Sequence, residues 1–342
     1  MKILIVTFPY DLGSRTIETN LVKFISLIAD VEVFRFAAQD SDEIDQGLNN
    51  RKSLIRRFQD TWKLRRAVRQ AVAEGRKILF YNISPAMFAY GSWRGGEAYI
   101  TMDWARRLLT PGHGKALTGV SRIHQKVLQS CAGLLPMTDA MEQCLIGEYG
   151  ISRSKIHRVP SLFDLEHFDP GELTSGERVR LLYVGGDAKR KGGHLVYDAF
   201  RSRLKDVCTL TMVTNFDFPP CEGFTLRKNI RYGTPEHLEL MRGYDVFVLP
   251  TRQDAGPQVI GEAAAAGLAV ITTRHALGAP HVVTHGINGF ISDSPESCIE
   301  DLVELVQFPE KIRQMRTESL QHMRKHFLKN VIASAYAKGM SH

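Results

Sequence analysis

Apolar runs of strand length alternate with helix-length segments through most of the sequence, and this rhythm is interrupted only once. Strands that alternate with helices indicate a parallel sheet with helices on both of its faces. The chain is therefore predicted to be an α/β protein. The strands predicted before the interruption are Lys2–Thr7, Val31–Phe36, Lys77–Asn82, Ala98–Met102 and Leu134–Pro136.

The interruption is the segment VPSLFDLEHFDPGELTSGE, which holds two prolines, two glycines and several acids and is typical of an interdomain linker. Two Rossmann-like halves are the simplest interpretation, with boundaries at 1–163, 164–325 and a last helix at 326–342 that packs back on the N-terminal half. Ligands of such folds bind beyond the carboxyl ends of the strands, which predicts a cleft between the halves. The strands predicted after the linker are Val179–Val184, Thr209–Val213, Ile230–Tyr232, Val246–Leu249, Val270–Thr272 and Phe290–Ile291.

Composition narrows the class of protein further. At 342 residues, 44% of them hydrophobic, the chain has enough apolar surface for two domains of ordinary size. Its longest apolar runs fall far short of the roughly 20 residues that a membrane span needs. The five cysteines are scattered and form no CxxC pair. Reduced thiols in a cytoplasmic protein are therefore expected, rather than disulfides or zinc ligands.

A glycine-rich basic loop follows the first strand after the linker. The sequence VGGDAKRKGGHLV places Gly185 and Gly186 at the end of that strand, and Arg190 and Lys191 before the next helix. Exposed backbone N–H groups, cations and a helix N-terminus together favour a diphosphate. The other interpretation is a solvated basic turn. The spacing is not that of a Walker loop.

Two acids flank the start of a later helix. Asp254 follows the strand Val246–Leu249, and Glu262 lies within the alanine-rich helix that begins near Gly256 and Pro257. Proline suits the first turn of a helix, where backbone N–H groups are free to receive phosphate oxygens. The acids are more than two helical turns apart, so only Asp254 can lie near the mouth of the helix. Glu262 is predicted to accept hydrogen bonds from ribose hydroxyls.

These motifs resemble those of the family-4 glycosyltransferases, which are retaining, nucleotide-sugar-dependent enzymes of the GT-B fold. DAGPQVIGEAAAAGLAVITT resembles the family's acid-x7-Glu signature, and YVGGDAKRKGGHLVYDAF resembles its diphosphate loop. HGINGF resembles its Gly-x-x-Gly-Phe turn, and RVPSLFDLEHFDP resembles its interdomain segment. The likeness covers about residues 130–330 in consistent order. Over residues 1–130 only the strand rhythm is similar.

The resemblance implies two Rossmann-like domains that face each other across a cleft. Residues 1–163 would bind the acceptor, and residues 164–325 would bind a nucleotide diphosphate sugar. Glu262 would bind the ribose, Arg190 and Lys191 would stabilise the leaving diphosphate, and Asp254 would contact the transferred sugar. The remaining donor-binding residues implied by the resemblance are Gly185, Gly186, Gly256, Pro257, Gln258 and Val259.

The sequence departs from the family pattern at several positions. Asp254 takes the place usually held by a glutamate, and Gly13 stands alone where a double glycine is frequent. Gly186 stands where an arginine is frequent, and Met102 precedes Asp103 where a His-Asp pair is common. Asp103 is therefore the catalytic residue predicted for the N-terminal domain. No cofactor and no metal are expected. The DSD motif Asp40–Asp42 imitates a metal-binding motif of the other glycosyltransferase fold, but its polar surroundings predict a solvated loop.

A strongly basic segment lies in the N-terminal half. The segment from Arg51 to Lys77 holds ten basic residues and only two acidic ones. It also contains the aromatic residues Phe58 and Trp62. Two interpretations remain open: a helix that docks on an anionic membrane at the inner face, and a core-packing helix with a solvated basic face. Nucleic acid is not expected as a partner, because no recognition motif accompanies the charge. Membrane docking would fit a lipid-linked or glycan acceptor.

Two alternatives to glycosyl transfer also remain open from the sequence. A nucleotide-sugar 2-epimerase of the GT-B fold would bind the same donor but needs further acid and base residues, which the sequence does not reveal. A non-catalytic protein that only binds a nucleotide sugar would tolerate the departures at Asp254, Gly186 and Met102.

Overall fold

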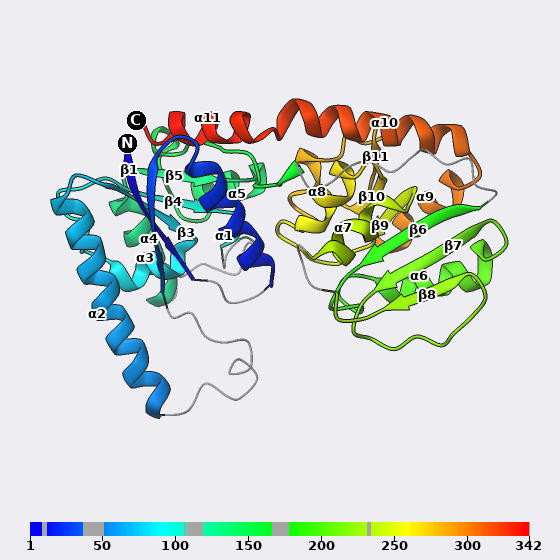
Figure 1. Ribbon diagram of the computed structural model, residues 1–342, viewed down its shortest axis with the longest axis horizontal. Coiled ribbons are helices and arrows are strands. Elements are labelled where there is room, and N and C mark those ends of the chain that lie inside the picture. Colours follow the sequence, from blue (N-terminus) through cyan, green and yellow to red (C-terminus); the bar gives the residue numbers. More distant parts are fainter. Residues whose placement is uncertain are drawn as a thin grey trace. The chain divides into compact units, whose positions relative to one another are not determined.

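The computed structural model describes residues 1–8, 12–36, 51–105, 108, 119–165, 178–230 and 234–341. The solvated loop predicted at Asp40–Asp42 lies outside the described residues. Contacts within the chain divide it into two compact units, which Figure 1 colours along the sequence. Unit 1 comprises Met1–Leu162 together with Lys329–His342, and unit 2 comprises Phe163–Leu328.

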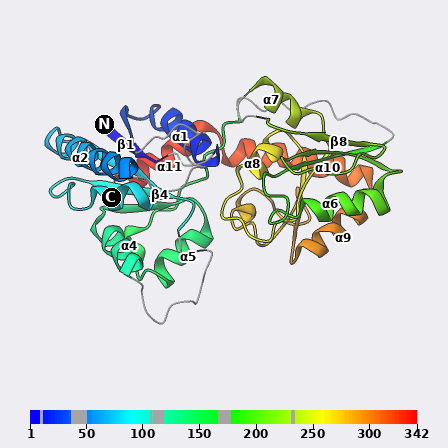
Figure 2. The same ribbon diagram turned by 90° about the horizontal axis from the view of Figure 1, so that it is seen from below.

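Unit 1 is built on a five-stranded parallel sheet with the strand order β2-β1-β3-β4-β5. Figure 2 shows α1 and α11 on one side of this sheet and α4 on the other. Every residue of β4 is buried, as expected for a parallel strand that is covered on both faces. The strands are β1 (Lys2–Thr7), β2 (Asp30–Arg35), β3 (Lys77–Tyr81), β4 (Ala98–Met102) and β5 (Gly133–Pro136). The helices are α1 (Leu12–Ile25), α2 (Arg51–Ala73), α3 (Ile83–Ala89), α4 (Gly119–Ser130), α5 (Asp139–Gly147) and α11 (Lys329–Gly339).

The C-terminal helix α11 is part of unit 1 although it follows unit 2 in the sequence. Its Tyr336 hydroxyl lies 2.8 Å from the Thr101 hydroxyl of β4, and both side chains are buried. Beyond the helix, the carbonyl of Met340 accepts a hydrogen bond of 3.0 Å from the Tyr99 hydroxyl. Burial raises the pKa of Tyr336, so its hydroxyl stays protonated and remains a hydrogen-bond donor.

Unit 2 is built on a six-stranded parallel sheet with the strand order β11-β10-β9-β6-β7-β8. Figure 2 shows α7 on one side of this sheet and α6 and α9 on the other. The two parallel α/β halves predicted from the strand rhythm are therefore confirmed. The strands are β6 (Val179–Val184), β7 (Cys208–Val213), β8 (Phe224–Arg227), β9 (Val246–Leu249), β10 (Ala269–Thr273) and β11 (Gly289–Ser292). The helices are α6 (Gly193–Ala199), α7 (Pro235–Arg242), α8 (Gln258–Ala265), α9 (Pro295–Leu305) and α10 (Pro309–His326).

One predicted strand of unit 2, Ile230–Tyr232, is tested only at its first residue, where it is not borne out. Ile230 lies outside any strand, residues 231–232 lie outside the described part of the chain, and the strand in this region is Phe224–Arg227. This strand, β8, is at the edge of the sheet, where alternate residues are more exposed. Its FTLR sequence carries only two apolar residues, so it gives a weak strand signal compared with the buried strands.

The strand order creates a switch point in each sheet. In unit 2, β6 and β9 are neighbours, but β7 follows β6 on one side and β10 follows β9 on the other. In unit 1, β1 and β3 are related in the same way, because β2 lies beyond β1 and β4 beyond β3. The loops that leave two such strands diverge and leave a crevice at the carboxyl edge, where ligands of open α/β sheets bind.

Candidate nucleotide-sugar site

The glycine-rich basic loop and the loop around Asp254 meet at the switch point of unit 2. The first follows β6 and the second follows β9. They are joined by a hydrogen bond of 2.9 Å from the Arg252 N–H to the Arg190 carbonyl. The Arg190 guanidinium also donates to the Gln253 carbonyl at 2.5 Å. Two segments that are about 60 residues apart in sequence thus form one surface.

Close packing explains two of the glycines in the first loop. Gly192 has a φ of 74°, and a Cβ atom there would lie 2.2 Å from the Pro250 carbonyl oxygen. A Cβ atom at Gly185 would lie 2.5 Å from the Tyr183 hydroxyl oxygen. Gly186 differs, because a Cβ atom there would meet nothing within 4 Å. Packing therefore requires glycine at Gly185 and Gly192, and it leaves open space above Gly186.

Both predicted cations lie beside the predicted acid. The Asp254 carboxylate is 3.4 Å from the Lys191 ammonium and 3.6 Å from the Arg190 guanidinium. Asp254 is fixed by its backbone, which donates to the His275 carbonyl and accepts from the Leu277 N–H, both at 2.9 Å. Arg190 is held by a second acid as well, since Asp187 accepts from its backbone N–H at 3.0 Å. This N–H bond is the main reason that the pKa of Asp187 lies below its usual value.

The first turn of α8 lies directly after the Asp254 loop. Pro257 occupies the N-cap position with a φ of −66°, and no side chain caps the helix. Gln258 and Val259, which form the first turn, are half-buried, and Gly256 lies in the loop before it. Backbone N–H groups of an uncapped first turn are available to an anion, and the helix dipole adds to the attraction.

Glu262 lies on α8, is 6% exposed, and has a partner that the sequence did not predict. His237 Nε2 on α7 lies 3.4 Å from a Glu262 carboxylate oxygen, and His237 is itself 6% exposed. The N-cap of α7 positions the histidine, because Thr234 Oγ1 accepts from the His237 N–H at 3.3 Å. Thr234-Pro235 is a recognisable helix start, but the sequence does not reveal that this helix faces α8.

Asp103, the remaining predicted site residue, belongs to unit 1. It follows β4, and the Tyr81 hydroxyl donates to its carboxylate at 3.4 Å. Met102, which precedes it, is fully buried in the sheet. The unit 2 residues discussed above are brought together by the structure, whereas Asp103 lies at the carboxyl edge of the other sheet.

Within the described part of the chain, no group of three or more His, Cys, Asp or Glu side chains is arranged to hold a metal ion. Among the described helices, none combines the length and the apolar character that crossing a bilayer requires.

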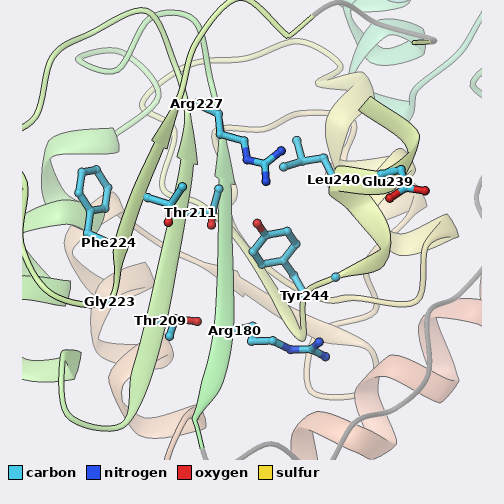
Figure 3. Close-up of a pocket in the computed structure, with 11 residues that line it drawn as sticks. Arg180, Thr209, Thr211, Gly223, Phe224, Arg227, Glu239, Leu240 and Tyr244 are labelled. Carbon is cyan, nitrogen blue, oxygen red and sulfur yellow. The ribbon is translucent and has the colours of Figure 1, made fainter. Parts of the chain in front are cut away.

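Unit 2 also has a cavity of about 560 Å³ on the face of the sheet, drawn in Figure 3. It lies over β6, β7 and β8 beside α7, and none of the predicted donor-binding residues lines it. Arg180, at one end, forms a two-armed ion pair with Asp245 at 2.8 and 2.9 Å, and the same carboxylate accepts a hydrogen bond of 2.7 Å from Arg316. The other lining residues are Thr209, Thr211, Gly223, Phe224, Thr225, Arg227, Glu239, Leu240, Gly243 and Tyr244.

Comparison with known proteins agrees with the geometry of unit 2. Residues 178–307, which hold both loops, α7 and α8, match the family described as "Glycosyl transferases group 1". These residues are a glycosyltransferase group 1 domain. The chain is also 25% identical over 235 residues to spore coat protein SA of Bacillus subtilis (strain 168). That match covers 58% of this chain and 62% of the relative's length.

Solved structures extend the likeness to both units of the chain. Anabaena HepE in complex with UDP and glucose has a TM-score of 0.72 at 15% identity and covers 100% of this chain and 99% of its own. Sucrose-phosphate synthase from Thermosynechococcus elongatus has a TM-score of 0.72 at 13% identity and covers 99% of this chain and 98% of its own. Together with the two parallel sheets, these likenesses confirm the predicted GT-B class of two Rossmann-like domains.

Proposed function

We propose that this chain transfers a sugar, with retention of configuration and without a metal ion, from a nucleotide diphosphate sugar to a glycan or lipid-linked acceptor. The main support is the pair of cations at the switch point of unit 2. Arg190 and Lys191 lie within 3.6 Å of Asp254, next to the uncapped first turn of α8. A diphosphate at this point meets two positive charges and a helix N-terminus. The UDP complex of HepE makes UDP-sugars the first donors to test.

The proposed mechanism follows from where charge develops. As the bond from the sugar C1 to the diphosphate oxygen breaks, the electron pair stays with the diphosphate and the sugar becomes positive. Arg190 and Lys191 stabilise the growing negative charge, and the α8 dipole adds to this stabilisation. The acceptor oxygen bonds to C1 on the face from which the diphosphate leaves, and its proton passes to that diphosphate. Asp254, which is negative, stabilises the positive sugar.

A donor screen tests the proposal. UDP-, ADP- and GDP-linked glucose, galactose and N-acetylglucosamine are each incubated with the protein, and free nucleoside diphosphate is measured over time. We expect one donor to release its nucleoside diphosphate slowly in the absence of acceptor, including in buffer containing a metal chelator. The anomeric configuration of a transferred product, measured by NMR, tests retention.

Three other results of the screen would contradict the proposal. Formation of a sugar inverted at C2 would identify a 2-epimerase, and tight binding without any turnover would identify a non-catalytic binding protein. Failure of every nucleotide sugar and of UDP to bind would remove the donor site itself.

We also propose that helix α2 docks the protein on an anionic membrane surface. The helix buries one stripe in unit 1, with Leu64 and Val68 fully covered. The opposite side carries exposed Lys63, Arg66 and Arg69, with Trp62 60% exposed. The Arg66 guanidinium lies 5.7 Å from the centre of the Trp62 ring. A tryptophan among cations suits the headgroup region of a bilayer.

The membrane prediction is that replacing Lys63, Arg66 and Arg69 with glutamate lowers binding to phosphatidylglycerol vesicles at least a hundredfold. Each cation near an anionic surface contributes about 1 kcal/mol, and the attraction is screened beyond a Debye length of about 10 Å. Vesicle sedimentation at low and high salt measures the effect. Arg65 is left unchanged because it donates to the Phe88 carbonyl.

The matched control carries the same charge change elsewhere. Lys205, Arg324 and Lys325 are exposed residues of unit 2, and their replacement with glutamate should leave vesicle binding nearly unchanged. Two results would show that α2 is only a core helix with a solvated face. Wild type would bind phosphatidylcholine and phosphatidylglycerol vesicles equally well, or both triple variants would lose vesicle binding to the same extent.

A further inference from the structure

The carboxyl edge of the unit 1 sheet carries polar residues at its own switch point. Val6 of β1 lies opposite Phe80 of β3, so Thr7 comes opposite Tyr81 and Asn82 follows directly. Asn82 remains tied to the sheet, since its N–H donates to the Thr101 carbonyl of β4 at 2.9 Å. Because β1 and β3 flank the switch point, these residues stand where open α/β sheets bind ligands.

Asn82 has an unusual backbone conformation. Its φ of 67° and ψ of 169° fall in a region that is populated almost only by glycine. Among the described residues other than glycine, only Asn229 shares a positive φ, and it lies in unit 2. Strained residues of this kind persist where the surrounding structure holds them, and they cluster at binding and catalytic sites.

The side chain of Asn82 is also unsatisfied. Asn82 is 5% exposed, and neither its amide oxygen nor its amide nitrogen has a hydrogen-bond partner among the described residues. It precedes α3 but does not cap that helix with its side chain. The Thr7 hydroxyl, fully buried on the neighbouring strand, likewise lacks a partner in the described part of the chain. Buried polar groups normally have partners, so two unsatisfied groups at one switch point indicate a ligand.

We infer that Asn82 and Thr7 form a subsite for a neutral sugar ring of the acceptor, with the amide bound to a vicinal pair of hydroxyls. This inference rests on the proposed function. An amide accepts from one hydroxyl through its oxygen and donates to the next through its nitrogen, which matches a vicinal diol. The amide is uncharged and does not select an anion. Asp103, held by the Tyr81 hydroxyl at the end of the next strand, borders the same edge.

The subsite opens when it binds the sugar. At 5% exposure the Asn82 amide is covered by its neighbours, so a sugar must displace them to reach it. The strained backbone makes such a local opening less costly at this position than at a relaxed residue.

Saturation-transfer NMR on the full chain tests the subsite with defined probes. The probes are the methyl glycosides of glucose, galactose, mannose and N-acetylglucosamine, each titrated in the presence of saturating UDP. We expect at least one glycoside to bind wild type. Asn82→Gly should weaken that binding about tenfold or more, because two hydrogen bonds are lost. Thr7→Val should weaken it less, because one hydroxyl is lost.

Stability measurements separate this role from a structural one. Glycine adopts the backbone conformation of Asn82 without strain. Asn82→Gly should therefore leave Tm unchanged or raise it by about 2–4 °C, while it lowers the affinity for the sugar. Asn229→Gly is the matched control at the other positive φ, which is exposed. It should keep or raise Tm in the same way and leave sugar binding unchanged.

Two outcomes would overturn the subsite: no glycoside binds wild type, or Asn82→Gly and Thr7→Val both bind as wild type does. A UDP titration of the same samples separates this failure from failure of the proposed function. If UDP binds and no glycoside does, only the sugar subsite is wrong. If UDP does not bind, the donor site is wrong whatever the glycosides do.

Discussion

Replacing Arg190 and Lys191 together with alanine is expected to lower turnover at least a hundredfold. Both cations lie at the switch point of unit 2, where the proposed mechanism develops negative charge on the leaving diphosphate. Loss of one group that stabilises developing charge typically costs a hundredfold to a thousandfold in kcat. Nucleoside diphosphate release from the donor that the screen identifies measures the effect.

The same double variant is expected to remain folded. Arg190 is substantially exposed, and partly exposed ion pairs such as those with Asp254 contribute little to stability, so the free energy of unfolding should fall by only about 1–2 kcal/mol. Arg252→Ala is the matched control, because this neighbouring exposed arginine pairs with Glu296 at 3.2 Å outside the proposed site. A folded double variant with wild-type turnover would refute the role of the two cations.

The second large effect is expected at Glu262. Glu262→Ala should weaken UDP binding by about 1–3 kcal/mol, which is a factor of about 5 to 150, because buried ribose hydroxyls lose their acceptor. Glu262→Gln keeps one acceptor oxygen and should lose less. Calorimetric titration measures the UDP affinity of the wild type, of Glu262→Ala and of Glu262→Gln.

His237 is expected to act through Glu262. The imidazole lies 3.4 Å from the carboxylate, so it orients the acid rather than binding the ribose itself. His237→Ala should therefore weaken UDP binding in the wild-type background and have little further effect once Glu262 is alanine, a coupling that a double-mutant cycle detects. Glu239→Ala, an exposed change on the same helix, is the control and should leave UDP affinity unchanged.

Unaltered UDP affinity in Glu262→Ala would contradict the proposal that Glu262 binds the ribose.

The strand rhythm predicted most of this fold because buried parallel strands are nearly continuous apolar runs. It identified β6 and β9 by sequence, together with the loops that follow them. It missed β8, an edge strand whose alternate residues are more exposed and which therefore carries fewer apolar residues.

The residues proposed for the donor site could be named from the sequence because each belongs to a local motif. Glycines that end a strand, cations before a helix, and an acid on either side of Gly-Pro are all visible within about 20 residues of sequence. The ion pairs of Asp254 with Arg190 and Lys191 join segments more than 60 residues apart, and no local pattern encodes them. The pairing of His237 with Glu262 has the same origin, since it depends on how α7 packs near α8.

The sequence did not indicate Asn82 as a site residue, for a different reason. Sequence patterns indicated that it ends a strand, which is correct to within one residue, but asparagine at a strand end is usually a simple turn residue. Its positive φ and its unsatisfied amide arise only when the sheet fixes the backbone on one side and α3 begins on the other.

A crystal structure of the protein with UDP is the most direct test of the donor site. The diphosphate should contact Arg190, Lys191 and the first turn of α8, and the ribose hydroxyls should reach Glu262. UDP bound instead in the cavity beside α7 (Figure 3), lined by Arg180 and Arg227, would contradict the account, because none of the proposed donor-binding residues lines that cavity.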